Sequence, residues 1–160
     1  GLASAAGLVC ENGIVVDEYM RTSDPAILAI GDCACFPEPT TGGRLRLESV
    51  QNANDQARTA AATLVGQPQA HGAIPWFWSE QGDMRLQSAG LMPPDGVRHL
   101  RPGATAGSFS VLHYAQAGLA CVESVNAPGD HIAARKLLEA GMSPAPERAC
   151  DPALPLKSFL

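Results

Sequence analysis

The chain has 160 residues, of which 46% are hydrophobic, 17% charged and 5% aromatic, and its formal net charge is −5. This length and apolar content support one moderate domain or two small ones and exclude a disordered chain. Interspersed charges argue against nucleic-acid binding, and no apolar run reaches the roughly 20 residues of a membrane span, so we expect a soluble protein with no nucleic-acid or membrane partner.

The amino-terminal part predicts a hairpin. Residues 1–7 are rich in Gly, Ala and Ser and lack an initial Met, which indicates a cut end. Residues 8–10 and 14–16 are short apolar runs on either side of an Asn12-Gly13 pair. An Asn-Gly pair between two such runs favours a tight turn between antiparallel strands.

The next apolar run predicts the centre of a binding site. Residues 26–32 read Ala-Ile-Leu-Ala-Ile-Gly-Asp, too short for a helix, and predict a buried strand that presents Asp32 at its carboxyl end. Ligands of open α/β sheets bind at that end, and a carboxylate suits a ligand rich in hydroxyl groups. The alternative is that Asp32 only caps the following turn.

Two cysteines and a loop follow this strand. Cys33 and Cys35 are one residue apart and have no second pair to complete four ligands, so no metal site is predicted and we expect them to pack beside a bound ligand. The five cysteines of the chain are odd in number and irregularly spaced, which predicts free thiols and a cytoplasmic location. Residues 36–43 contain two prolines and two glycines and predict a loop.

A helix is predicted over residues 49–64, with Ser49 as its cap and Gly66 beyond its end. Its amino end would present unpaired N–H groups and a partial positive charge. Residues at spacings of three and four predict an almost entirely alanine buried face, consisting of Val50, Ala53, Ala57, Ala60, Ala61 and Leu64.

Beyond a linker at residues 67–74, the pattern becomes that of antiparallel strands. Strands are predicted over residues 85–90, 97–101, 108–115 and 119–125. A helix from residue 128 to 140 should be capped by Asp130 and closed by Gly141, and the proline-rich tail from Ser143 should run extended over the surface. The four histidines fall in the linker, in strands and in this helix, away from any nucleophile motif, so no catalytic residue is assigned.

Both tryptophans lie in residues 75–81, Pro-Trp-Phe-Trp-Ser-Glu-Gln. One interpretation is a hydrophobic plug for the second lobe. The other is that one indole lies against a flat aromatic cofactor or lines an electron path.

Three segments together resemble a known family. Residues 22–32, Thr-Ser-Asp-Pro-Ala-Ile-Leu-Ala-Ile-Gly-Asp, resemble the second FAD-contacting motif of flavoprotein reductases with two dinucleotide-binding domains. Residues 46–53 and 75–81 narrow the resemblance to FAD-dependent ferredoxin reductases of the putidaredoxin reductase and rhodocoxin reductase type, which serve cytochrome P450 and ring-hydroxylating dioxygenase systems. The resemblance covers essentially the whole chain but only the carboxyl-terminal part of that family.

The resemblance implies roles for individual residues. Asp32 would accept hydrogen bonds from the FAD ribityl chain, and the Val50 amide would meet the pyrimidine edge of the isoalloxazine. Trp78 would lie near the flavin on the side that faces the iron–sulfur partner. The basic residues near these motifs, Arg44, Arg46 and Arg85, are predicted to meet an acidic [2Fe-2S] ferredoxin, with solvated surface charge as the alternative.

The implied fold is α+β. Residues 1–72 would be the last segment of an α/β FAD-binding domain, and residues 73–160 a small antiparallel-sheet-plus-helix interface domain of the reductase C-terminal kind. The family commonly has Asp where this chain has Glu80, a mild change. The Gly-x-Gly-x-x-Gly fingerprint of a dinucleotide-binding unit does not occur here, so we expect a fragment that is inactive alone and needs the rest of the FAD and NAD domains.

The leading functional hypothesis is therefore that the parent protein is an enzyme, an oxidoreductase that passes electrons from NAD(P)H through FAD to a ferredoxin. Thiol chemistry of the disulfide reductases is not expected, because their carboxyl-terminal His-Pro segment is missing. The alternative is an interaction or dimerisation module of a flavoprotein like apoptosis-inducing factor, whose relatives share a Pro-aromatic-aromatic-Trp-Ser segment, so a homodimer is considered.

Overall fold

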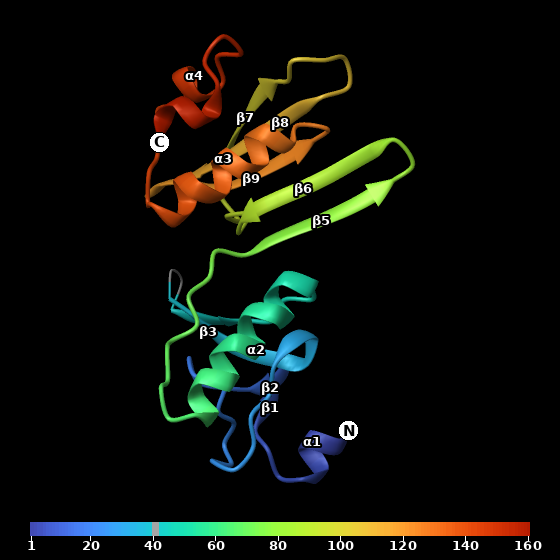
Figure 1. The fold of residues 1–160 in the computed structure, drawn as a ribbon, viewed down its shortest axis with the longest axis vertical. Helices are drawn as coiled ribbons and strands as arrows, with labels where there is room; N and C mark the ends of the chain where they lie inside the picture. Colours follow the sequence, from blue (N-terminus) through green and yellow to red (C-terminus); the bar gives the residue numbers. More distant parts are fainter. Residues whose placement is uncertain (40–41) are drawn as a thin grey trace. The chain divides into compact units, whose positions relative to one another are not determined.

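A computed structural model describes residues 1–39 and 42–160 of the chain. The chain separates into two units, Gly1–Ala73 and Ile74–Leu160. The sequence places the boundary between residues 72 and 73, inside the linker. Figure 1 draws the elements of each unit.

The first unit contains a four-stranded sheet in the order β1-β2-β3-β4. After a short helix α1 (Leu2–Ala5), β1 (Cys10–Glu11) pairs antiparallel with β2 (Gly13–Val15), which confirms the predicted hairpin. Strand β2 is parallel to β3 (Ala34–Glu38), and β3 is antiparallel to β4 (Gly43–Leu45).

The loop predicted over residues 36–43 is wrong for the residues of β3 and β4, and residues 40–41 lie outside the described residues. A proline is tolerated in a strand where no ladder hydrogen bond is required of its nitrogen. Pro37 meets this condition on the β2 side, because the pairing with β2 ends at Cys35.

The buried strand predicted over residues 26–32 is also wrong. The segment makes one isolated bridge, between Leu28 and Arg21, and then enters a single turn of 3₁₀ helix, η1 (Gly31–Cys33). Ile27 and Ile30 are 37% and 39% exposed. An apolar run becomes a strand only where its backbone finds partners along its length, and here Ile27 and Ala29 bond the backbone of residues 20–22 while Gly31 bonds a side chain of the next α-helix.

Helix α2 (Val50–Leu64) confirms the predicted helix, and the Ser49 side chain caps it by accepting a hydrogen bond from Asn52 N. The predicted alanine face is wrong except at Ala60. Val50 and Leu64 are exposed, whereas the buried residues are Asn52, Gln56, Thr59 and Ala60.

Polar side chains are buried on α2 because the irregular segments beneath it need hydrogen-bond partners. Asn52 Nδ2 donates to Leu47 O at 3.1 Å, and Thr63 Oγ1 donates to Tyr19 O at 2.9 Å. Each such bond satisfies a backbone carbonyl that no strand ladder pairs. The apolar core of the unit is small and consists of Val16, Met20, Ala29, Ala34, Phe36 and Ala60.

The second unit is built on a five-stranded antiparallel sheet in the order β5-β6-β9-β8-β7. Its strands are β5 (Trp76–Gln81), β6 (Met84–Gly90), β7 (Val97–Pro102), β8 (Phe109–Ala115) and β9 (Gly118–Val125). The four predicted strands are thus confirmed, and the aromatic segment adds a fifth at the edge.

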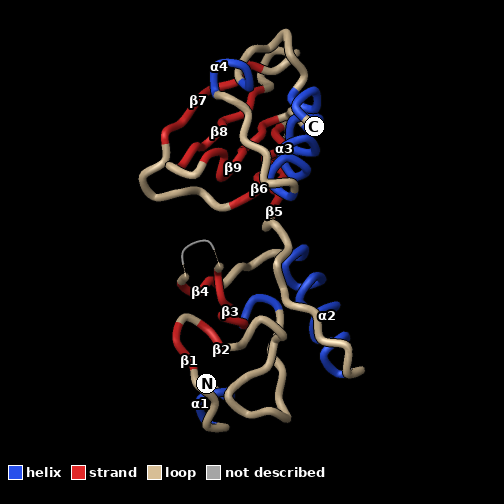
Figure 2. The backbone as a smooth tube through the Cα atoms, turned by 90° about the vertical axis from the view of Figure 1, so that its left-hand side faces the viewer, coloured by secondary structure: helices blue, strands red, loops and turns tan. Residues whose placement is uncertain are grey.

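Helix α3 (Pro128–Glu139) covers one face of this sheet, as Figures 1 and 2 both show. Gly141 follows its end with a φ of 63°, as predicted. The predicted cap is wrong, because no side chain caps the helix and the Asp130 carboxylate instead meets Arg101 Nε at 2.9 Å. Pro128 starts the helix without a side-chain cap, since its missing N–H needs no partner.

The carboxyl-terminal tail is not simply extended over the surface. It forms α4 (Pro146–Ala149) and a 3₁₀ turn, η2 (Leu156–Phe159), and buries Ala149 and Leu156 in the core of the second unit. Prolines at the first helical position start such turns rather than prevent them.

Candidate flavin site

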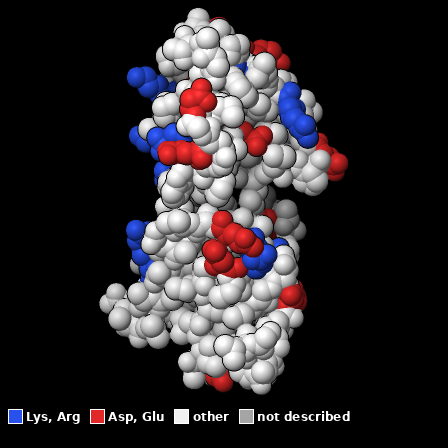
Figure 3. All heavy atoms as spheres, turned by 90° about the vertical axis from the view of Figure 1, so that its right-hand side faces the viewer, with Lys and Arg blue, Asp and Glu red and all other residues white. Residues whose placement is uncertain are grey.

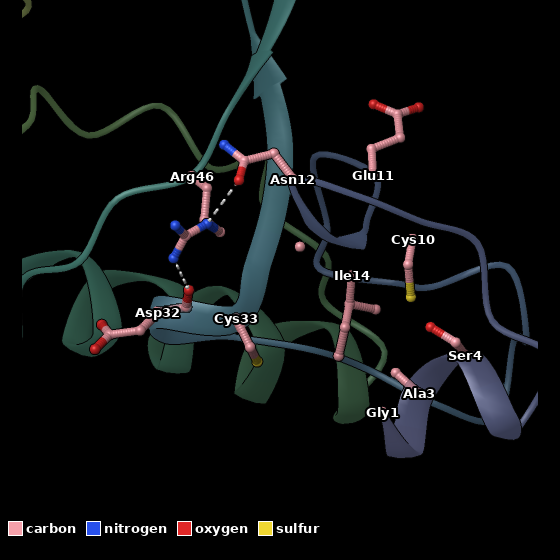
Figure 4. Close-up of a pocket in the computed structure, with 11 residues that line it drawn as sticks. Gly1, Ala3, Ser4, Cys10, Glu11, Asn12, Ile14, Asp32, Cys33 and Arg46 are labelled. Atoms are coloured by element: carbon pink, nitrogen blue, oxygen red, sulfur yellow. Dashed lines mark hydrogen bonds between the residues drawn. The ribbon is translucent and has the colours of Figure 1, made fainter.

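Asp32 lies in η1 with an exposed side chain. Its backbone oxygen accepts a hydrogen bond from Arg46 Nη1 at 2.9 Å. Figure 4 shows its carboxylate directed away from Cys33 and Ile14. Within residues 1–39 and 42–160 no hydrogen bond or ion pair engages this carboxylate, so both of its oxygens can accept hydrogen bonds from a ligand.

Gly31 fixes η1 beside the first turns of α2. Its N–H donates to the buried Gln56 Oε1 at 2.7 Å. Its φ is +73°, in the region that favours glycine, and a Cβ here would lie 3.5 Å from Ala53 Cβ. The close approach of Gly31 to Ala53 brings Asp32 beside the amino end of the helix that Val50 begins.

The amino end of α2 is open. Val50 is its first residue, and its side chain is 62% exposed. The Ser49 hydroxyl satisfies one N–H of the first turn, that of Asn52. The first N–H groups of a helix have no partner within the helix and carry a partial positive charge, so they attract electron-rich ligand atoms.

A shallow open pocket of about 430 Å³ is lined in part by residues of η1. Asp32, Cys33, Asn12 and Arg46 are among its lining residues, and Figure 4 shows Arg46 between Asn12 and the Asp32 carbonyl. Cys33 thus lies beside a cavity, whereas Cys35 is buried in β3. In the described part of the chain no three His, Cys, Asp or Glu side chains are arranged to hold a metal ion.

The three arginines singled out from the sequence all make contacts within the chain. Arg44 Nη1 donates to Val16 O at 2.9 Å. Arg46 pairs with Glu48 as well as with the Asp32 carbonyl. Arg85 Nε lies 3.6 Å from Glu80 Oε1, the residue opposite it in the β5–β6 pair, and both side chains are more than half exposed.

Trp78 belongs to the second unit and is half-buried on β5, where it pairs across the strand with Gln87. Its ring contacts the ring of Trp76, with 5.4 Å between centroids. The structure therefore brings Asp32 and Val50 together within the first unit, and Trp78 is carried by the other unit.

Sequence reasoning missed Gln56, which holds Gly31, and Arg101, which is 5% exposed and pairs with Asp130. A signal existed for each. Gln56 lies four residues after Asn52 and therefore shares its helix face. Arg101 lies two residues after His99 on β7, on the face that alternation assigns to the core.

No helix in the described ranges is long and apolar enough to cross a membrane. On the face drawn in Figure 3, acidic and basic side chains are mixed within each unit, and neither sign forms a continuous patch. That face offers no basic surface of the kind that nucleic acids require.

Comparison with known proteins identifies two families. Residues 76–160, just over half of the chain, match the family described as "Reductase C-terminal", and residues 1–57 match "Pyridine nucleotide-disulphide oxidoreductase". The chain is 50% identical over 156 residues to rhodocoxin reductase of Rhodococcus erythropolis, covering 98% of this chain and 36% of that protein.

Two solved structures of ferredoxin reductases are similar to this chain over nearly its whole length. A ferredoxin reductase from Rhodopseudomonas palustris is 45% identical with a TM-score of 0.92, covering 98% of this chain and 39% of that one. Putidaredoxin reductase in its covalent complex with putidaredoxin is 38% identical with a TM-score of 0.90, covering 99% and 38%. The chain thus spans less than two-fifths of the length of these relatives. The α+β fold and the resemblance to the carboxyl-terminal part of FAD-dependent ferredoxin reductases are confirmed, and the chain belongs to the reductase C-terminal family.

Proposed function

We propose that the chain is part of a longer flavoprotein that transfers electrons from NAD(P)H through FAD to a [2Fe-2S] ferredoxin serving a cytochrome P450 or ring-hydroxylating oxygenase. The observation that carries this proposal is the free Asp32 carboxylate beside the open amino end of α2, in a chain similar over 98% of its length to rhodocoxin reductase. We infer a cytoplasmic location from the five free cysteines.

The residues present fit a flavin. The Asp32 carboxylate would accept hydrogen bonds from the ribityl hydroxyls, and the Val50 N–H would donate to the pyrimidine edge, where the partial charge of the helix stabilises negative charge. When bound, FAD would take a hydride from NAD(P)H and release its electrons singly. Gln56 would hold Gly31, and through it the Asp32 backbone, in place.

Trp78 would stand between the flavin and the ferredoxin. A half-buried indole leaves part of its aromatic ring system available for contact with a neighbour. Arg85 would contribute to docking of an acidic ferredoxin, as would Arg44 and Arg46 to the extent that their internal contacts leave N–H groups free. If ferredoxin reduction by the full-length protein were indifferent to ionic strength, this docking role would be refuted.

The activity is tested on the full-length reductase that carries this chain. It should reduce cytochrome c with NADH or NADPH only when a ferredoxin is added, and Trp78→Ala should slow the ferredoxin step more than reduction of the flavin. Equal slowing of both steps would refute the partner-side role of Trp78. A stable dimer that fails with several ferredoxins would favour the interaction-module function instead.

Flavin binding by the chain itself is tested by titration with FAD. Because the chain matches less than two-fifths of its relatives, we expect the isolated chain to stay colourless after gel filtration. In the full-length protein, Asp32→Ala should lower the flavin content, whereas Glu18→Ala, which removes another exposed carboxylate of the first unit outside these motifs, should leave it unchanged. Equal flavin content in both variants would contradict the role of Asp32.

A further inference from the structure

Trp78 is positioned mainly by one neighbouring ring. It lies on β5, an edge strand that is paired on one side only, by β6. In the described chain its single ring contact is with Trp76, at 5.4 Å between centroids and 32° between planes. Residues two apart on a strand share a face, so the orientation of Trp76 limits the orientations open to Trp78.

Trp76 is in turn held from helix α3. Arg135 Cζ lies 4.5 Å from the centroid of the Trp76 ring, and the His131 ring lies 5.6 Å from it. His131 and Arg135 are four residues apart and therefore lie on the same side of the helix. Trp76 is thus enclosed by Trp78 on its own strand and by two side chains of α3.

Ring contacts, not hydrogen bonds, hold this cluster together. Trp76 Nε1, both ring nitrogens of His131 and Arg135 Nε are buried and have no hydrogen-bond partner among the residues that the structure describes. A guanidinium over an indole face is attracted by the ring electrons, and the attraction grows when both groups are removed from water. The Arg135–Trp76 contact is therefore the interaction in this cluster that favours one orientation of the Trp76 ring.

His131 does not oppose this contact. It is 2% exposed, and burial, reinforced by the charges of Arg135 and Arg85, lowers the pKa of its ring to about 4. The ring is therefore neutral at neutral pH, and Arg135 is the one cation that lies over the Trp76 ring among the residues described by the structure.

We propose that Arg135 is a positioning residue for electron transfer, which holds Trp76 by a cation–π contact and through it fixes the orientation of Trp78. The proposal rests on the function proposed above for Trp78. It assigns α3 a part in that function, since Arg135 on this helix contacts the Trp76 ring that Trp78 also contacts.

The first test is spectroscopic and uses the 160-residue chain, whose only two tryptophans are Trp76 and Trp78. The exciton couplet of two neighbouring indoles in circular dichroism depends on their mutual orientation. Arg135→Met keeps an alkyl stem over Trp76 and removes a buried N–H that has no partner, so we expect a folded chain with a weakened couplet. Arg135→Lys should restore part of the couplet, because it restores the cation.

The matched control is Lys136→Met, which removes the same charge from an exposed position one residue along α3 and should leave the couplet unchanged. Arg135→Gln is a second neutral variant in case Arg135→Met does not fold. A wild-type couplet in either folded neutral variant would overturn the proposal.

The second test separates this proposal from the proposed function. In the full-length, flavin-loaded reductase, Arg135→Met should slow the ferredoxin step by up to about thirtyfold, the factor that a desolvated cation–π contact can contribute to a conformational population. Reduction of the flavin by NAD(P)H should be unchanged. If Trp78→Ala leaves the ferredoxin step unaltered, the function proposed for Trp78 fails while the couplet result stands. If Trp78→Ala slows that step and Arg135→Met does not, the positioning role of Arg135 fails alone.

Discussion

Replacing Arg101 by Met should detach the carboxyl-terminal segment from the sheet of the second unit. The guanidinium donates to the Asp130 carboxylate at 2.9 Å, to the carbonyl oxygens of Ala149 and Asp151 at 2.8 Å, and to that of Leu154 at 3.0 Å. One side chain of β7 therefore joins α3 to three points of the segment that follows it.

The expected loss in the free energy of unfolding follows from the burial of the Arg101–Asp130 ion pair. The side chains of Arg101 and Asp130 are 6% and 15% exposed. Removing one member of a buried ion pair costs about 3–5 kcal/mol, because the other charge is left unpaired. Arg101→Met also removes the donor to the Ala149 oxygen, which lies in a buried hydrogen bond, whereas the Asp151 and Leu154 oxygens are part-buried and add less. For a unit of this size we expect the midpoint of thermal unfolding to fall by on the order of 15–30 °C.

Urea unfolding followed by tryptophan fluorescence measures this cost, because both tryptophans lie in the second unit. Arg98→Met, at an exposed position of the same strand, is the control and should cost little. The double variant Arg101→Met/Asp130→Leu should be more stable than Arg101→Met alone, since no charge is left unpaired. A loss below about 1 kcal/mol in Arg101→Met, the scale of one ordinary hydrogen bond, would refute the reasoning.

Three further predictions concern steric fit, pH and thiol reactivity. Gly90→Ala should destabilise the second unit by about 1–3 kcal/mol more than Gly82→Ala. Both glycines have a positive φ, but of the two only a Cβ at Gly90 would meet a carbonyl oxygen, that of Ala120 at 2.1 Å. Equal unfolding midpoints for the two variants would contradict this prediction. The pKa of His131 in the folded chain is lowered to about 4, from an unfolded value of about 6.5. As the pH drops through this range the unfolded chain binds a proton at His131 and the folded chain does not, so the free energy of unfolding should fall by about 2 kcal/mol between pH 7 and pH 5. His131→Phe should remove that part of the pH dependence in urea titrations, and an unchanged slope would rule the histidine out as its source. A thiol reagent should label the exposed Cys10 and Cys33 rapidly in the native chain, the half-buried Cys150 more slowly, and the buried Cys35 and Cys121 only after unfolding. Rapid labelling of Cys35 or Cys121 in the native chain would contradict this burial.

The elements that sequence analysis predicted correctly are those whose signals are local. The hairpin at Asn12-Gly13 and the start of α2 at Ser49 each depend on side chains within a few residues. The antiparallel strands of the second unit are marked in the same way, by alternation and by short turns such as residues 116–117 between β8 and β9.

The predictions that failed depend on distant partners. The apolar run at residues 26–30 is not a strand, because a strand also needs a neighbour along its whole length. The buried face of α2 was predicted from hydrophobicity, but the helix packs on irregular backbone that needs hydrogen bonds, so Gln56 is buried and Val50 is exposed. Asp130 was predicted as a helix cap, and the buried guanidinium of Arg101, distant in sequence, takes its carboxylate instead.

The same distinction between local signals and distant partners applies to the candidate site. Residue type and motif were enough to single out Asp32 and Val50, since a free carboxylate and a helix amino end are recognisable from short stretches. What brings the two together is a pair of contacts that neither stretch contains, Gln56 with the Gly31 N–H and Arg46 with the Asp32 carbonyl.

Arg46 illustrates why nearness in sequence is a weak guide to the role of a long side chain. It was predicted to meet a ferredoxin because it lies close to the flavin motifs, yet its guanidinium bridges the Asp32 carbonyl and Glu48, just before α2 begins. A ferredoxin carboxylate would have to compete with both of these acceptors. Among the described residues the Arg85 guanidinium has one ion-pair partner, Glu80, at 3.6 Å, and because both side chains are more than half exposed this pair contributes little and is exchanged readily. Of the two, Arg85 can therefore more readily replace Glu80 with a carboxylate of a partner protein. Arg46 is better placed to fix the backbone at Asp32 in the candidate site.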